Sequence, residues 1–187
     1  MPLSQDTLKE IEIQVRGGFE DRERIIEILC EEMYEPGELD PAEVAGAVDK
    51  ALAAHEVSKT HWPTVTDCDK LEHVFNKLKE QGIIALHNTG YTQSDGYDDF
   101  REKLESLADP QHVVGYCFYH AQDLERAVRG EGLNLAFGPP DSRDENTKGP
   151  AVGRTIVDEL QGAGFEVDWD GTFATRICIR RFDWKRR

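Results

Sequence analysis

The hydrophobic pattern of this chain changes near Gly82, and this change constrains the fold more than any other feature. Before it, apolar residues recur at helical spacing, as in Leu8, Ile11 and Val15. After it, short apolar runs alternate with helical segments that are bounded by glycine and proline. We therefore predict an α+β fold, in which an N-terminal helical region precedes a mixed sheet of about five strands.

The helical region is predicted to cover residues 1–82. Gly17-Gly18 should separate two helices within it, because glycine is costly in a helix interior. Asp40 followed by Pro41 predicts another helix start, since aspartate caps unpaired backbone N–H groups and proline suits the first helical position.

The sheet is predicted to lie in residues 83–187 and to end in a hairpin that turns at Asp170-Gly171. The predicted strands are residues 83–87, 112–119, 133–137, 165–169 and 175–179. The predicted helices around them are residues 67–81, 95–107, 122–129 and 152–160, and residues 138–150 are expected to form a loop. We expect these helices to lie mostly on one face of the sheet, and residues 1–187 to form a single domain.

The net charge of −15 is unevenly distributed along the chain. Residues 1–110 carry 11 Lys/Arg and 25 Asp/Glu, whereas residues 111–187 carry 11 and 12. Because an acidic surface repels phosphate backbones, we expect no nucleic-acid partner. The acidity is expected either to keep the protein soluble or to form a face for a basic protein partner.

Several features predict a cytoplasmic protein without a membrane partner. The longest apolar runs are far too short to cross a bilayer, and residues 1–16 lack the pattern of a signal peptide. The four cysteines are far apart in the sequence and form no CxxC pair, which favours reduced, buried thiols.

Polar residues cluster after two of the predicted strands. They are His87, Asn88 and Thr92 after the first strand, and His120, Gln122 and Asp123 after the second. If these strands are parallel neighbours, both clusters lie at one edge of the sheet and can form a small ligand-binding pocket.

A catalytic alternative makes His120 a base that is oriented by Asp123, with His87 nearby. A structural alternative is that Asp123 only stabilises a helix start and that Asn88 builds a turn. The two histidines and Asp123 are also residue types that bind metals, but their spacing matches no metal motif. No metal and no other cofactor is predicted.

The basic, aromatic C-terminus, residues 180–187, has two interpretations. It can contact RNA or another acidic surface, or it can dock onto the acidic helical region of its own chain. We favour the second, in which Phe182 and Trp184 are packing anchors.

Several strings resemble a bacterial family that is catalogued only as a domain of unknown function. They are Gly115–Glu125, Leu133–Gly138, Asn88–Thr92, Trp169–Thr172 and Arg176-Ile177. The resemblance spans roughly residues 65–187. It implies a shared fold and supplies no activity, ligand or catalytic residue.

The chain contains no GxGxxG, GxxxxGK[ST], GxSxG or HExxH motif. We therefore expect a non-catalytic domain that binds a small molecule or a protein. The alternatives are a small hydrolase or lyase that uses the His/Asp pocket, an immunity- or antitoxin-type interaction protein, and a structural subunit of a larger assembly. The sequence does not decide whether the protein is an enzyme.

Overall fold

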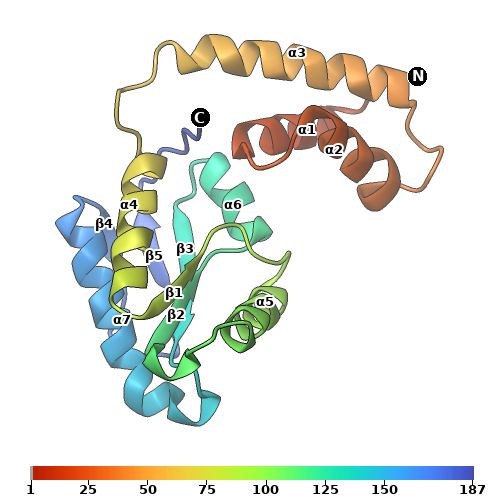
Figure 1. Ribbon diagram of the computed structural model, residues 1–187. Coiled ribbons are helices and arrows are strands. Elements are labelled where there is room, and N and C mark those ends of the chain that lie inside the picture. The colour runs from red at the N-terminus through yellow and green to blue at the C-terminus, as the bar shows by residue number, and fades with distance from the viewer. Residues whose placement is uncertain (1) are drawn as a thin grey trace. The chain divides into compact units, whose positions relative to one another are not determined.

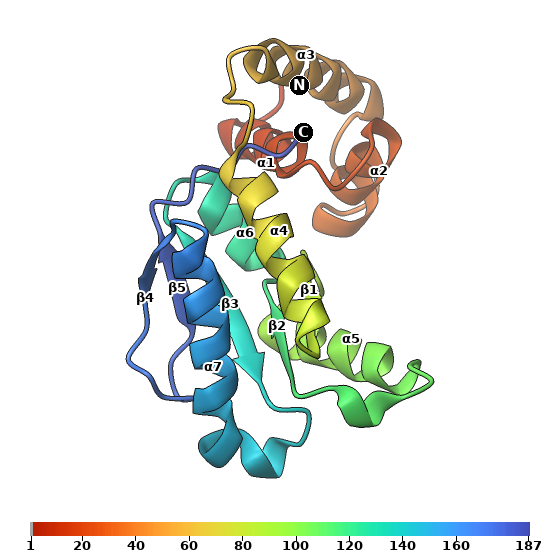
Figure 2. The same cartoon turned by 60° about the vertical axis from the view of Figure 1, so that its left-hand side comes forward.

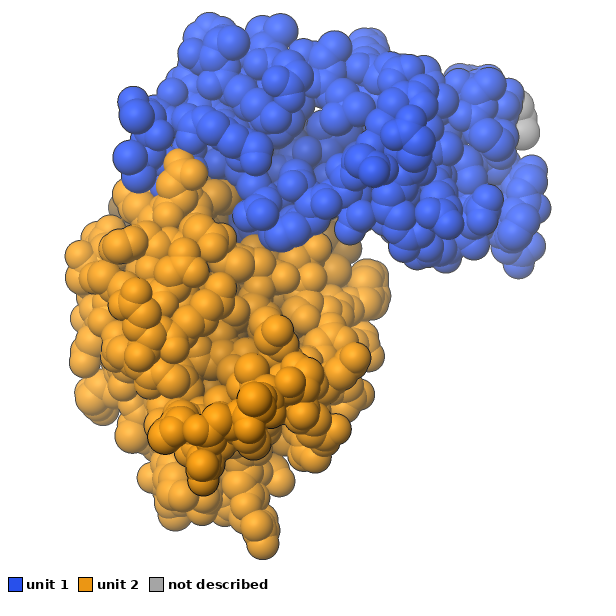
Figure 3. Space-filling view, viewed as in Figure 1, with its two compact units in different colours: residues 1–66, 184–187 blue, residues 67–183 orange. Residues whose placement is uncertain are grey.

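A computed structural model describes residues 2–187 and divides the chain into two compact units (Figures 1 and 3). The helical unit runs to Thr66 and also includes Trp184–Arg187, whereas the sheet unit is Asp67–Asp183. The units divide at Thr66 rather than at Gly82, because the helix before Gly82 packs with the sheet.

From Pro2 onward, the helical unit contains four helical segments: α1 (Gln5–Gly17), α2 (Arg22–Glu27), the π-helix η1 (Ile28–Met33) and α3 (Pro41–Lys59). Gly18 ends α1 with a φ of 73°, which only glycine adopts readily, so the predicted break is confirmed. Asp40 caps α3, since its Oδ1 accepts a hydrogen bond from the N–H of Ala42 at 2.9 Å.

The C-terminal residues from Trp184 onward belong to the helical unit and confirm the predicted intramolecular docking. Trp184 is only 4% exposed and donates its indole N–H to the carbonyl of Arg16. The guanidinium of Arg186 lies 4.0 Å from the ring centre of Phe19. These two contacts are with a carbonyl group and an aromatic ring, so charge attraction is not their only basis.

The sheet unit is built around five strands in the order β1-β2-β3-β5-β4. The strands are β1 (Ile83–Leu86), β2 (Gly115–Phe118), β3 (Leu133–Gly138), β4 (Glu166–Asp168) and β5 (Ile177–Arg180). β1 and β2 are parallel, and the other neighbours are antiparallel. The predicted mixed sheet and its C-terminal hairpin are therefore confirmed.

Helices cover both faces of this sheet, not mainly one as predicted (Figures 1 and 2). α4 (Asp67–Glu80) and α7 (Glu145–Gly162) lie on one face, and α5 (Gln93–Glu105) and α6 (Ala121–Val128) lie on the other. The physical reason is visible in β2, all four of whose residues are buried. A strand that is apolar on both sides requires cover on both.

The predicted loop at residues 138–150 is wrong in its second half. The 3₁₀ segments of the unit are η2 (Pro110–His112) and η3 (Ser142–Asp144), and α7 begins directly after η3. Pro150 lies inside α7 and forfeits one helix hydrogen bond. Burial of Ile156 and Leu160, both 0% exposed, outweighs that loss. None of the helices in residues 2–187 combines the length and the apolar character needed to span a membrane.

Candidate functional site

The loops that follow β1 and β2 meet at one edge of the sheet, as the parallel pairing requires. The N–H of Thr89 donates to the carbonyl of Tyr119, and the N–H of Ala121 donates to the carbonyl of Gly90, both at 3.1 Å. The backbone therefore brings the two predicted polar clusters together.

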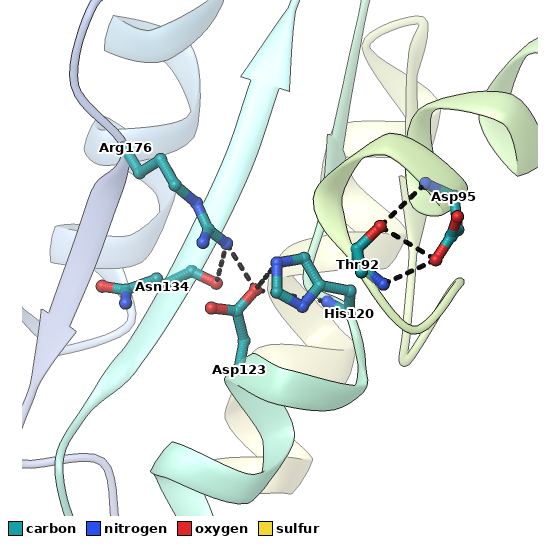
Figure 4. A network of polar contacts seen from close by, with 6 residues as sticks. All are labelled: Thr92, Asp95, His120, Asp123, Asn134 and Arg176. Carbon is teal, nitrogen blue, oxygen red and sulfur yellow. Dashed lines mark hydrogen bonds and ion pairs between the residues drawn. The ribbon is translucent and has the colours of Figure 1, made fainter.

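A buried cluster of three charged or titratable side chains lies beside these loops (Figure 4). His120 Nε2 is 3.0 Å from Asp123 Oδ2, and a guanidinium nitrogen of Arg176 contacts the same carboxylate oxygen. The same Arg176 nitrogen donates to the carbonyl of Asn134 at 3.2 Å. Asp123 is 1% exposed and His120 is 4% exposed, so the carboxylate is neutralised almost entirely within the protein.

Local sequence explains why Asp123 is placed there. His120 is the N-cap of α6 and Asp123 is its third residue, so the carboxylate reaches back to accept the backbone N–H of His120 at 3.3 Å. The carboxylate thus has the structural role that was the alternative to a catalytic one. It also pairs with Arg176, which comes from the C-terminal hairpin.

The cluster holds His120 in its neutral form near pH 7. Burial lowers the pKa of His120, Asp123 opposes this effect, and Arg176 adds to it. Because Nε2 is the nitrogen beside the carboxylate, the hydrogen-bond network assigns the proton to Nε2 and a lone pair to Nδ1. Nδ1 is buried without a hydrogen-bond partner among residues 2–187, as are Arg176 Nε and Asn88 Oδ1.

His87 belongs to a different environment. Its Nδ1 is 3.0 Å from the Tyr119 hydroxyl, its Nε2 is 3.0 Å from Glu72 Oε2, and its ring centre is 4.4 Å from that of Phe75 on α4. His87 thus contacts α4, whereas His120 contacts Asp123 on α6, and these two helices lie on opposite faces of the sheet (Figures 1 and 2).

The separation of His87 from His120 counts against both the catalytic and the metal-binding alternatives, because each needs the two imidazoles close together. Direct cooperation of both imidazoles at one reacting atom requires hydrogen-bond reach, which opposite faces do not provide. Within residues 2–187, no three or more His, Cys, Asp or Glu side chains are grouped so that they could hold a metal ion.

The other candidate residues are mostly engaged in local structure. Thr92 caps α5 and forms a reciprocal capping box with Asp95, whose Oδ2 accepts the N–H of Thr92 at 2.8 Å. Asn88 adopts a φ of 45°, as a turn residue does. Gln122 is exposed on α6. The structure thus gathers His120 and Asp123, assigns Thr92 to a cap, and separates His87.

Sequence reasoning missed Arg176. In the alternating pattern of the hairpin, Arg176 falls on the face that does not carry the buried Ile177. Such a position is typical of a residue that faces solvent. An arginine that alternates with apolar residues, as Arg180 also does, was a weak signal of an ion pair with Asp123.

The comparisons with known proteins identify the domain but no activity. A family model described as a domain of unknown function (DUF6891) matches residues 2–187, so the helical unit belongs to the same family domain as the sheet. No curated protein and no solved structure matches the chain.

Proposed function

We propose that this chain, which belongs to the DUF6891 family of domains of unknown function, is a non-catalytic binding domain whose helical unit recognises a positively charged protein partner. One observation carries the proposal. From Glu27 to Glu43 the chain has seven Asp/Glu residues and no Lys or Arg. We call this stretch the acidic segment.

The acidic segment is accessible to a partner. Glu31, Glu35 and Asp40 are exposed, and Met33 among them is 46% exposed. Arg24 pairs with Glu27 and with Glu32 and so neutralises part of the charge. The stretch remains strongly acidic, and methionine is among the residue types that are enriched at protein interfaces.

The strand-end cluster is a weaker candidate for the main function. The carboxylate of Asp123 is already paired with Arg176 and with the imidazole of His120, and both Asp123 and His120 are buried. A charged ligand would have to break existing pairs to gain new ones, and breaking a buried pair is costly.

The test is binding of an arginine- and lysine-rich peptide, measured by calorimetry at several salt concentrations. We expect wild-type binding to weaken as salt rises, because exposed charges are screened within about 8 Å at physiological ionic strength. Glu31→Lys/Glu35→Lys should weaken binding by at least about tenfold, since two charges change sign at the contact and the net charge changes by four units.

A matched control uses Asp98→Lys/Glu102→Lys. These residues are exposed on α5 in the sheet unit, and this variant changes the net charge equally. We expect it to retain most of the affinity. Equal weakening by both pairs, or no binding by the wild type at low salt, would refute a partner surface on the helical unit.

This function is compatible with the cytoplasmic location expected from the sequence. An immunity- or antitoxin-type role is a specific form of it, in which the basic partner is a protein whose activity is masked by binding. An immunity- or antitoxin-type role also requires that formation of the complex inhibits the partner.

A second candidate is a small-molecule site, or a hydrolase or lyase centre, at the strand ends. It is favoured by the unpartnered, neutral Nδ1 of His120, which Asp123 orients as a hydrogen-bond acceptor or base. A thermal-shift screen of metabolites on wild type and His120→Gln tests it, since a ligand of the folded state raises the melting temperature. A hit that survives unchanged in His120→Gln would count against this site.

A further inference from the structure

The helical unit contains a hollow at the point where three segments meet. It has a volume of about 590 Å³, within the range of roughly 300–1,000 Å³ that is typical of ligand pockets. The start of α1, the end of η1 and the start of α3 contribute its lining. All of its lining residues lie between Pro2 and Glu43, so the hollow belongs to the helical unit alone.

The lining of the hollow combines apolar and acidic side chains, with hydroxyl groups on one side. Apolar walls come from Leu3, Leu39 and the ring of Tyr34. Three acidic residues, Glu38, Asp40 and Glu43, also line the hollow. Among the residues from Pro2 onward that line the hollow, none is Lys, Arg or His.

A chain of hydroxyl groups fixes one side of the hollow. Ser4 Oγ is 2.7 Å from Thr7 Oγ1, which is 2.9 Å from the hydroxyl of Tyr34. Thr7 is 1% exposed, so this chain ties α1 to the end of η1 from inside the unit. The position of the Tyr34 ring is therefore set by a hydrogen bond as well as by packing.

Two of these carboxylates, those of Glu38 and Asp40, are held in place by the backbone. Glu38 Oε2 accepts the N–H of Glu35 at 3.2 Å, and Asp40 Oδ1 accepts the N–H of Ala42 at 2.9 Å. Each of these bonds uses one carboxylate oxygen. The second oxygen of each group can accept from a ligand without disturbing the turn or the helix cap.

The π-helix provides a separate reason to regard this place as functional. η1 ends at Met33, directly before Tyr34. π-helical segments are rare, cost helix stability and occur frequently at functional sites.

We infer that this hollow anchors an arginine side chain of the basic partner, with the aliphatic stem against Leu39 and the guanidinium between Glu38 and Asp40. The inference rests on the proposed function and names the contact that would give it specificity. Arginine fits better than lysine because its planar fork serves several separated acceptors and stacks on an aromatic ring such as Tyr34.

The test compares two peptides on the untagged chain. One carries a single arginine between two leucines in a glycine/serine background that contains further lysines, and the other replaces that arginine by citrulline. Citrulline keeps the shape of the side chain but has no charge. We expect the arginine peptide to bind at least about tenfold more tightly, because charge-assisted hydrogen bonds are stronger than neutral ones.

The protein variant is Glu38→Gln/Asp40→Asn. Both substitutions keep an oxygen acceptor for the backbone N–H, and asparagine is as good a helix cap as aspartate. We expect this variant to lose most of the preference for arginine over citrulline. The control, Glu31→Gln/Glu35→Gln, removes the same charge from the acidic segment outside the hollow and should keep that preference.

The outcomes separate this inference from the proposed function. Equal losses of affinity and an unchanged arginine preference in both variants would show diffuse recognition by the acidic segment, and would overturn the hollow as the anchor. Failure of the wild type to bind either peptide would overturn the proposed function as well. Loss of the preference in the hollow variant alone supports the inference.

Discussion

Replacing Asp123 by asparagine tests whether the buried cluster stabilises the sheet unit. Asparagine keeps the size of the side chain and an oxygen that can accept from His120. It removes the negative charge that faces the guanidinium of Arg176. The substitution therefore isolates the ionic part of the contact.

The expected cost follows from burial. Removing one partner of a fully buried ion pair costs about 3–5 kcal/mol, because the other charge is left uncompensated. Asp123 has a side-chain exposure of 2%, but that of Arg176 is 30%, and its nitrogen still donates to Asn134. Water thus relieves part of the cost, and we expect a loss of about 2–3 kcal/mol in the free energy of unfolding. For a chain of this length that corresponds to a melting temperature lowered by roughly 5–10 °C.

The matched control is Asp168→Asn on the neighbouring hairpin. Asp168 pairs with Arg180 at 2.5 Å, but the two side chains are 58% and 54% exposed. We expect this variant to melt at the wild-type temperature, since exposed pairs contribute little.

Thermal unfolding by circular dichroism gives the midpoints, and hydrogen exchange of the β3 amides assigns the change to the sheet unit. A second variant, Asp123→Asn/Arg176→Met, should recover stability relative to Asp123→Asn, because it removes the uncompensated charge. Equal midpoints for Asp123→Asn and Asp168→Asn would refute the argument that burial makes the cluster important.

Three further predictions concern pH, packing and the C-terminus. Burial lowers the pKa of His120 below its usual 6.5, so the unfolded chain binds a proton at His120 more tightly than the folded chain does. The contribution of His120 to stability is therefore complete above pH 6.5 and is lost as the pH falls below that value. His120→Gln should flatten this decline in a series of urea titrations. A Cβ at Gly96 would lie 2.5 Å from the ring of Phe118, so Gly96→Ala should cost about 1–3 kcal/mol by denaturant unfolding, whereas Gly46→Ala, with no heavy atom within 4 Å, should be neutral or slightly stabilising. Trp184→Ala should lower the free energy of unfolding by about 3–5 kcal/mol and reduce the hydrogen-exchange protection of α1 and α3. Unchanged protection in these helices would contradict a core role for the C-terminus.

Local chemistry made parts of the fold predictable. Asp40 followed by Pro41 encodes a helix start within two residues. Asp170-Gly171 encodes a chain reversal, but the connection between β4 and β5 covers residues 169–176 and is longer than the predicted turn. In the hairpin, Asp170 Oδ1 accepts from the N–H of Thr172 and from the hydroxyl of Thr175. Signals of this kind need no knowledge of distant residues.

The errors arose where distant packing decides. Pro150 is a local sign of a loop, and only the burial of Ile156 and Leu160 against the sheet makes the helix around it stable. The prediction of helices on one face failed because the cover of a strand depends on which segments return to it. Strand alternation cannot supply that information.

The candidate site shows the same limit. His120 and Asp123 are three residues apart, and their pairing follows from a helix start. Arg176 lies 53 residues after Asp123, and His87 is drawn to the opposite face by Phe75 and Tyr119. The parallel pairing of β1 and β2 was a sound basis for bringing the loops together, but it did not determine the side-chain directions.

The two groups of charges in this protein differ in what a partner can gain from them. A buried charge must be compensated inside the fold, so Asp123 and Arg176 already satisfy each other, and a ligand that recruits one of them leaves the other exposed to the full desolvation cost. The carboxylates of Glu38 and Asp40 are exposed and each uses one oxygen for a local turn or cap, so they cost little while no partner is bound. In the proposed complex, an arginine that displaces water from them gains both Coulomb attraction and new hydrogen bonds. This asymmetry is the physical reason for proposing recognition in the helical unit and a stabilising role for the buried pair at the strand ends.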